Sequence, residues 1–164
     1  PLVCQKKSLM RDFKKINNFN NNKFTKYKLI ILGSIYNFST KGFIPIYNCM
    51  TKKINEDKIP NSSILYVPHP RSDEQTIKKI KNNYKWSVLN KSISAEELLS
   101  ISIKPQIWSS SSSSIIYAHK IYNFDCTIFS LNKFKYYFSL ARYVKEFSIK
   151  FFFNFLGAKV ININ

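Results

Sequence analysis

The chain has 164 residues, 45% of them hydrophobic and 16% aromatic, which excludes a disordered chain and allows one domain with a buried core. Its formal net charge of +17 suits a polyanionic partner: a nucleic acid, an anionic membrane surface or a phosphorylated substrate. Because the lysines are spread along the whole chain, a bias towards lysine codons explains the charge equally well.

The chain opens with a basic, Asn-rich segment, in which we predict a short helix near Lys6–Ile16 and a linker around Asn17–Asn22. Next comes "YKLIILGS" at 27–34, a short apolar run that is typical of a buried strand. A long polar loop is predicted to follow, through Lys58. A second strand is predicted at 63–70, where two prolines end it.

Strands and helices then alternate to the end of the chain. Ser72 and the acidic residues after it are predicted to open a helix. Ser94 and Glu97 have the spacing of a capping box at the start of another. The remaining predicted elements, in order, are a helix at 72–84, a strand at 85–90, a helix at 94–101, a strand at 105–109, a helix at 113–122, a strand at 126–131, a helix at 139–157 and a last strand or edge at 158–164.

This alternation with short connections predicts an α/β fold, an open, doubly wound parallel sheet with flanking helices. In such sheets ligands bind beyond the carboxyl ends of the strands, where loops lead into helix N-termini. Two unusual segments fall there. One is "PHPR" after the second strand, and the other is the run of serines, Ser109–Ser114, after the fourth. We therefore expect the binding site between these two segments.

The serine run leads into a predicted helix, whose first amide N–H groups and partial positive charge attract phosphate. Ser113 and Ser114 stand directly before "IIYAH", so we expect their hydroxyl groups to face an anion. Ser109–Ser112 are interpreted as a turn without individual roles.

His69 lies between Pro68 and Pro70, which restrict the backbone around it. A phosphate beside the imidazole would raise its pKa from about 6.5 and make it a hydrogen-bond donor or a general acid. Arg71 adds a guanidinium group suited to phosphate or carboxylate. The alternative is that His69 is a strand-end residue whose ring only bonds a backbone carbonyl.

Three other features are open to two interpretations. Glu96 and Glu97 could accept hydrogen bonds from ribose hydroxyls, although helix capping alone explains Glu97. His119 is expected on the flank of a helix, without a functional role. The Phe-rich segment 147–155 is interpreted mainly as core, and its lysines leave a role at a membrane interface open.

Several classes of protein lose support. Cys4, Cys49 and Cys126 are odd in number and far apart, which argues against a disulfide framework and a structural zinc site and favours a reducing, cytosolic setting. No GxGxxG, GxxxxGKS or DxD-like pattern occurs, which disfavours dinucleotide binding, P-loop chemistry and metal-dependent sugar transfer. No apolar run reaches the roughly 18 residues that span a bilayer, so we expect a soluble or peripheral protein. The first residue is Pro1, which is compatible with a fragment.

Three segments together resemble a known family. "ILYVPHPR", "SAEELL" and "PQIWSSSSSSIIYA" are similar to the C-terminal half of the bacterial GT-B sialyltransferases, most of all to the lipooligosaccharide sialyltransferases and their capsular polysialyltransferase relatives. In that family an HP motif and a downstream Ser-Ser motif hold the CMP part of CMP-sialic acid. Here these motifs correspond to His69-Pro70 and Ser113-Ser114, whose separation suits the family.

The resemblance implies an inverting, metal-independent transfer of sialic acid from CMP-sialic acid to a terminal sugar of a cell-surface glycan, lipooligosaccharide or capsule. His69 would be the catalytic residue, because it would donate to the departing CMP phosphate. Neither a cofactor nor a metal is expected. The residues implied in binding CMP are His69, Pro70, Arg71, Glu97, Ser113 and Ser114.

The resemblance also implies a domain organisation. Residues 1–27 would be a basic N-terminal helix or linker, and residues 28–164 a Rossmann-like donor-binding domain, one half of a GT-B fold. A missing N-terminal domain or a second copy would complete the enzyme. The expected partners are the nucleotide-sugar donor and a glycan acceptor. The expected location is the cytoplasm, with peripheral contact to the anionic inner face of the membrane.

One motif of the family is not matched. The general base of the family belongs to an acidic-acidic-Gly motif, and Thr40-Lys41-Gly42 stands where this motif is expected. Glu56 and Asp57 follow later but do not match it, so we expect weak or no activity from this chain alone. Two competing hypotheses remain: a basic nucleic-acid-binding module, which the resemblance disfavours, and a folded but inactive sialyltransferase remnant.

Overall fold

The computed structural model describes residues 24–34, 41–89, 93–131 and 140–163. The strands are β1 (Leu29–Leu32), β2 (Ile64–Val67), β3 (Ser87–Val88), β4 (Gln106–Ser109), β5 (Cys126–Leu131) and β6 (Lys159–Ile163). The helices are α2 (Phe43–Glu56), α3 (Glu74–Lys79), α4 (Ala95–Ile101), α5 (Ser114–Ile116) and α6 (Leu140–Phe155). Short helical turns are η2 (Asn61–Ser63), a 3-10 turn, and η3 (Ile80–Tyr84) and η4 (Tyr117–Ile121), both π-helical.

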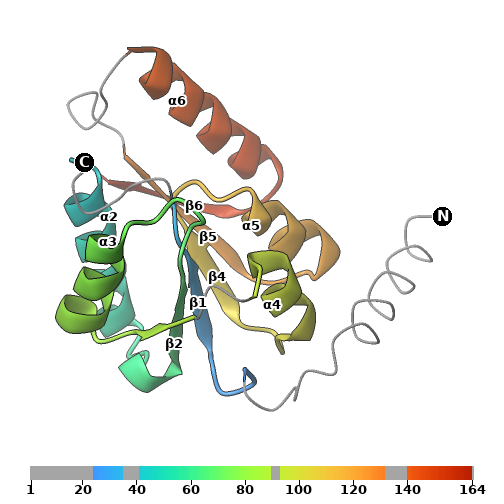
Figure 1. Cartoon of the computed structure of the whole chain (residues 1–164). Helices are drawn as coiled ribbons and strands as arrows, with labels where there is room; N and C mark the ends of the chain where they lie inside the picture. Colours follow the sequence, from blue (N-terminus) through green and yellow to red (C-terminus); the bar gives the residue numbers. More distant parts are fainter. Residues whose placement is uncertain (1–23, 35–40, 90–92, 132–139, 164) are drawn as a thin grey trace.

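The described strands form one parallel sheet in the order β3-β2-β1-β4-β5-β6 (Figure 1). This confirms the predicted α/β fold, a Rossmann-like open parallel sheet with flanking helices. The chain builds outward from β1 to β3, then returns to the other side of β1 and builds outward again to β6. The loops after β1 and β4 therefore lead in opposite directions, and such a point in a parallel sheet is where ligands bind.

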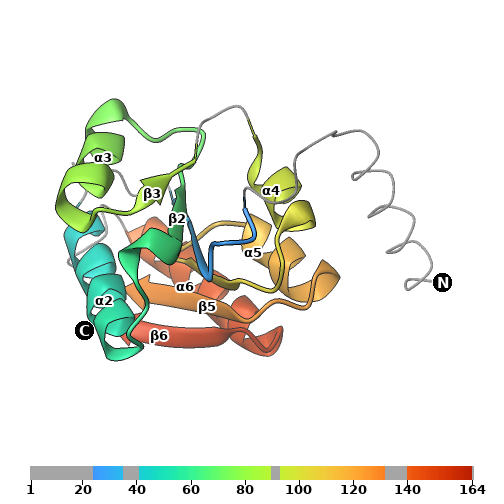
Figure 2. The ribbon, with the colours of Figure 1, turned by 90° about the horizontal axis from the view of Figure 1, so that it is seen from below.

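The strands β1, β2 and β5 are buried along their whole length. Because side chains alternate between the two faces of a sheet, both faces are covered at these strands. On β1, Ile30 and Leu32 belong to one core with residues of α4 and α5, and Leu29 and Ile31 belong to another with residues of α2. Figures 1 and 2 show α2 and α3 on one side of the sheet, and α4 and α5 on the other. Burial on both faces explains why β1 reads as an uninterrupted apolar run.

The prediction of a long polar loop through Lys58 is wrong, because α2 occupies most of that segment. Its apolar residues recur at intervals of three or four and form the buried face of the helix. They are Phe43, Ile46, Tyr47, Met50 and Ile54. Pro45 lies in the first turn, where a helix tolerates proline because the N–H groups there have no partner within the helix.

The predicted capping box at α4 is confirmed, with the Ser94 hydroxyl accepting from the Glu97 N–H at 3.1 Å and the Glu97 carboxylate accepting from the Ser94 N–H at 2.8 Å. The start predicted for the preceding helix is wrong by one residue. Asp73, not Ser72, is the N-cap of α3, and its carboxylate accepts from the Thr76 N–H at 2.7 Å.

The predicted long helix is present as α6, but its interpretation as core is wrong for most of the phenylalanines. Phe153 is buried with the α4 and α5 core. The exposed apolar side chains of α6 are Val144, Phe147, Phe151, Phe152 and Phe155, which are 46% to 80% exposed. In Figure 1 the first turns of α6 stand clear of the other ribbons. Across the described residues, no helix is both long and apolar enough to cross a membrane.

Some sequence predictions fall outside the described residues, namely the helix near Lys6–Ile16, the linker around Asn17–Asn22 and any role of Cys4. Cys49 and Cys126 are free thiols. Burial raises the pKa of the Cys126 thiol to about 12, so it packs as a small apolar group rather than reacting as a thiolate.

Candidate functional site

A cavity of about 630 Å³ opens at the carboxyl edge of the sheet, at the reversal point between β1 and β4. Its wall includes His69 and Pro70 from the loop after β2, and Ser111–Ser114 from the loop after β4. The start of α4 contributes Ser94, Ala95 and Glu96. The structure thus brings together the two segments that the sequence suggested.

Gly33 allows the end of β1 to approach the loop that carries His69. A Cβ atom at this position would lie 2.7 Å from the backbone nitrogen of His69, 2.8 Å from the Tyr66 hydroxyl oxygen and 2.8 Å from the Val67 carbonyl oxygen. The Gly33 N–H also donates to that carbonyl at 2.7 Å. Only glycine fits this approach. Gly33 was not among the predicted site residues, although a glycine directly after an apolar run was the available signal.

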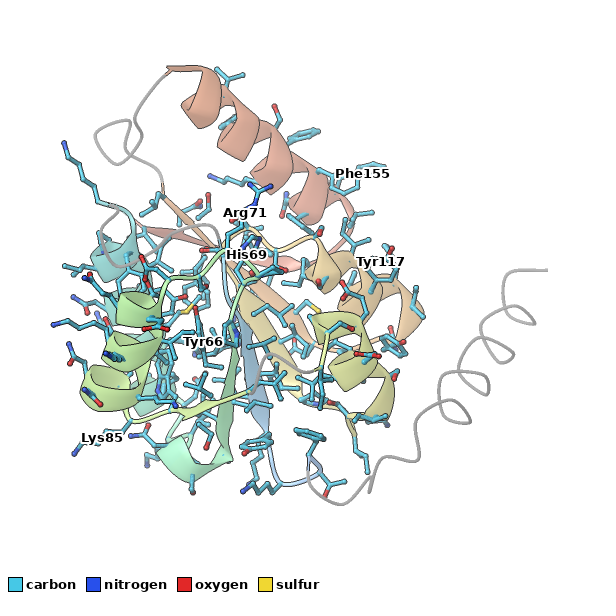
Figure 3. All side chains as sticks on the ribbon, viewed as in Figure 1. Tyr66, His69, Arg71, Lys85, Tyr117 and Phe155 are labelled. Atoms are coloured by element: carbon cyan, nitrogen blue, oxygen red, sulfur yellow. The ribbon has the colours of Figure 1, made fainter. Side chains whose placement is uncertain are left out.

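The ring of His69 is held by its own loop. The backbone N–H of Arg71 donates to the Nδ1 atom of His69 at 3.1 Å, so this nitrogen carries no proton and the proton of the neutral ring lies on Nε2. The alternative interpretation of His69, as a strand-end residue without function, required a backbone carbonyl as the partner of the ring. The partner of Nδ1 is instead a backbone N–H. Figure 3 shows His69 and Arg71 at the carboxyl edge, at the opposite end of the molecule from Lys85.

The electrostatic surroundings of His69 differ from the expectation. Burial, and secondarily the positive charge of Arg71, lower the pKa of His69 from its usual value. The predicted rise of the His69 pKa requires a phosphate next to the ring. The protein alone therefore favours a neutral imidazole whose Nε2–H is a hydrogen-bond donor. Arg71 is exposed and is not part of the cavity wall.

The first serine of the run has a definite structural role, so the interpretation of Ser109–Ser112 as a turn without individual roles is wrong. The Ser109 hydroxyl donates to the Leu32 carbonyl at 3.2 Å and accepts from the Ser112 N–H at 3.0 Å. It thereby joins β1 to β4 and fixes the turn that leads to α5. The Ser111 hydroxyl oxygen is buried and has no hydrogen-bond partner in the described part of the chain.

The two serines at the start of α5 have different surroundings. Ser113 is exposed, and its side chain makes no capping hydrogen bond. Ser114 is buried, and its hydroxyl donates to the Glu96 carboxylate at 2.6 Å. That short distance is typical of a hydrogen bond to a charged acceptor.

Glu96, and not the predicted Glu97, lines the cavity. Consecutive residues on a helix point about 100° apart, so only one of two neighbouring glutamates can face the same space. Glu97 is engaged in the capping box. Among the described residues, Glu96 carries the only carboxylate on the cavity wall.

Within the described residues no acidic-acidic-Gly motif lies on the cavity wall, and its one carboxylate, that of Glu96, accepts from Ser114. The helix α2 begins after Gly42 at the carboxyl edge and runs back towards the amino edge, which puts Glu56 and Asp57 at the far end of the sheet. Asp57 forms an ion pair with Lys53 there. Thr40 lies outside the described residues, and Lys41 is exposed.

His119 lies away from the cavity and has a structural role, as its expected place on a helix flank suggests. The Leu156 carbonyl, at the C-terminal end of α6, accepts from His119 Nε2 at 2.8 Å and from the Lys120 ammonium at 2.9 Å. These bonds satisfy a carbonyl that the helix leaves open and attach α6 to η4.

Comparison with known protein families identifies the family of this chain. The family model described as "Alpha-2,8-polysialyltransferase (POLYST)" matches residues 2–131. This range contains the whole cavity wall, including His69-Pro70 and Ser113-Ser114. A search of curated proteins found no match.

Proposed function

Because this chain belongs to the alpha-2,8-polysialyltransferase family, a family of glycosyltransferases that transfer sialic acid, we propose that its cavity binds the CMP part of CMP-sialic acid. On this proposal, residues 28–164 are the donor-binding half of a GT-B enzyme. The observation that carries the proposal is that His69-Pro70 and Ser113-Ser114, which are far apart in the sequence, line one cavity.

The phosphate would lie between the two motifs. The Nε2–H of His69 and the hydroxyl of Ser113 are donors on this wall, and the first N–H groups of α5 add a partial positive charge. The carboxylate of Glu96 would accept from a ribose hydroxyl. Apolar side chains of the wall, Leu89 and Ile93, would cover the cytosine ring.

The reaction would be a single displacement with inversion. The acceptor hydroxyl attacks the anomeric carbon of sialic acid, the bond from that carbon to the CMP phosphate oxygen breaks, and CMP leaves. His69 would stabilise the charge on the leaving phosphate through Nε2–H. On this proposal these donors of the protein, and not a metal, stabilise the leaving phosphate. The proton of the acceptor hydroxyl would pass to a base supplied by another domain or a second copy.

Thermal unfolding with and without CMP tests the donor site. A ligand at 100 times its Kd stabilises a protein by about 2.7 kcal/mol, which raises Tm by several degrees. We expect this shift for the wild type and not for His69→Ala. Absence of a shift at millimolar CMP in the wild type contradicts the proposal. Stabilisation by CMP in a protein that transfers no sialic acid when its acceptor half is restored identifies an inactive remnant.

A peripheral membrane contact through α6 is a second proposal, and it rests on the exposed side chains Phe147, Phe151 and Phe155. They recur every four residues and form one stripe on a protein of net charge +17, which suits an anionic bilayer. Vesicles of phosphatidylglycerol should retain the wild type in flotation and lose it when Phe151 and Phe155 are changed to serine. Concentration-dependent dimerisation lost in the same variant, without vesicle binding, assigns the stripe to a second copy instead.

A further inference from the structure

The two serines that open α5 differ in the one property that a phosphate ligand needs, an available hydroxyl proton. The Ser114 hydroxyl has a single proton, and it donates this proton to the Glu96 carboxylate at 2.6 Å. What remains on the Ser114 oxygen are its two lone pairs, which can only accept. A phosphate oxygen is an acceptor as well, so the same hydroxyl cannot donate to phosphate while it holds Glu96.

Ser113 has the opposite character. It is exposed on the cavity wall, and its hydroxyl makes no hydrogen bond with any described residue. Its proton is available to an anion. The buried Ser111 hydroxyl on the same wall is also without a partner among the described residues, and an unpaired buried hydroxyl is costly unless a ligand satisfies it.

Glu96 needs to be held in place, and Ser114 is the only described side chain that bonds it. Glu96 lies in the first turn of α4, on a flexible side chain that would otherwise sample several rotamers. The bond to Ser114 uses one carboxylate oxygen, Oε1, and leaves the other free to accept. It also joins the start of α5 to the start of α4 across the cavity.

We propose that Ser114 is a positioning residue, which orients Glu96 towards the ribose of the nucleotide, and that the phosphate is bound by Ser113 without Ser114. The proposal rests on the CMP site proposed above. It assigns different tasks to the two serines of the pair: Ser113 recognises the phosphate, and Ser114 recognises the sugar through Glu96.

Calorimetric titration with four ligands separates these tasks: CMP, cytidine, which lacks the phosphate, and two CMP analogues, one without the 2′ hydroxyl and one without the 3′ hydroxyl. Ser113→Ala should weaken CMP about threefold to tenfold and leave cytidine unchanged. Ser114→Ala should weaken CMP and cytidine by the same factor. It should also remove the preference for CMP over one deoxy analogue, and Glu96→Ala should do the same. Ser114→Thr, which keeps a hydroxyl group, should retain the preference that Ser114→Ala loses.

Two controls keep the interpretation specific. Ser110→Ala removes another buried serine of the same run that does not line the cavity, and it should change none of the four affinities. If Ser114→Ala does not fold, Glu96→Ala, at a partly exposed position, gives the same comparison.

The opposite pattern overturns the proposal. If Ser114→Ala weakens CMP but not cytidine, and keeps the preference for the ribose hydroxyls, then Ser114 binds the phosphate. If Glu96→Ala keeps that preference, Glu96 does not bind the ribose. A wild type that binds neither CMP nor cytidine refutes the CMP site itself, which is a different result from either of these.

Discussion

Replacing Gly33 with alanine puts a methyl group where the end of β1 meets the loop that carries His69. The new carbon would lie 2.7 to 2.8 Å from three atoms, two of which are backbone atoms of His69 and Val67. Backbone atoms cannot rotate away as a side chain does, so the strands must separate. Overpacking of this kind costs typically 1–3 kcal/mol, and we expect a loss of about 3 kcal/mol.

The same displacement moves the His69 loop, so CMP affinity should fall at least tenfold in the folded fraction of Gly33→Ala. Denaturant unfolding measures the stability, and titration with CMP measures the affinity. Gly157→Ala is a matched control. Its φ of +84° strains an alanine by roughly 1–2 kcal/mol, but the nearest atom is 3.7 Å away and belongs to His119, outside the cavity. A Gly33→Ala protein with unchanged stability and unchanged affinity refutes this account of the close approach.

Two further predictions concern the same edge of the sheet. Ser109→Ala removes the bond to the Leu32 carbonyl and leaves the Ser112 N–H without its acceptor, so it should cost about 1–3 kcal/mol in urea unfolding, whereas Ser110→Ala should cost clearly less. The pKa of His69 is lowered in the free protein, so its contribution to stability is present above about pH 6.5 and is lost as the pH falls through the folded pKa. A bound phosphate raises that pKa, so CMP affinity should increase as the pH falls from 8 to 5.5. The phosphate of CMP itself titrates in this range, so the contribution of His69 is the difference between the pH profiles of CMP affinity of the wild type and of His69→Gln. Parallel profiles of the two proteins would show that protonation of His69 does not strengthen CMP binding.

The fold could be predicted from the sequence because a parallel sheet buries both faces of its strands, and a short, uninterrupted apolar run such as that of β1 is typical of such a strand. The helix α2 was missed for a related reason. Only one of its faces is buried. The residues of that face, which include Tyr47 and Met50, are separated along the sequence by Asn, Thr and Lys residues that are typical of loops. A count of apolar residues at helical spacing across the segment would have found it.

The site could be predicted only as far as chain order determines it. The carboxyl ends of β2 and β4 had to lie at one edge of the sheet, which brought His69 and Ser113 to the same region. The choice between Glu96 and Glu97 depends on the rotation of α4, and the fit of Gly33 depends on contacts between different strands. The exposure of the α6 phenylalanines depends on where this helix lies against the sheet. Local sequence patterns do not determine how a helix is rotated or which residues of different elements come into contact.

Calorimetry with CMP and cytidine measures whether His69 binds the phosphate of a cytidine nucleotide in this cavity. We expect wild-type protein to bind CMP more tightly than cytidine, and His69→Ala to bind the two ligands equally, with its affinity for cytidine unchanged. A wild type that does not distinguish CMP from cytidine, or a His69→Ala variant that keeps the full preference for CMP, would contradict it.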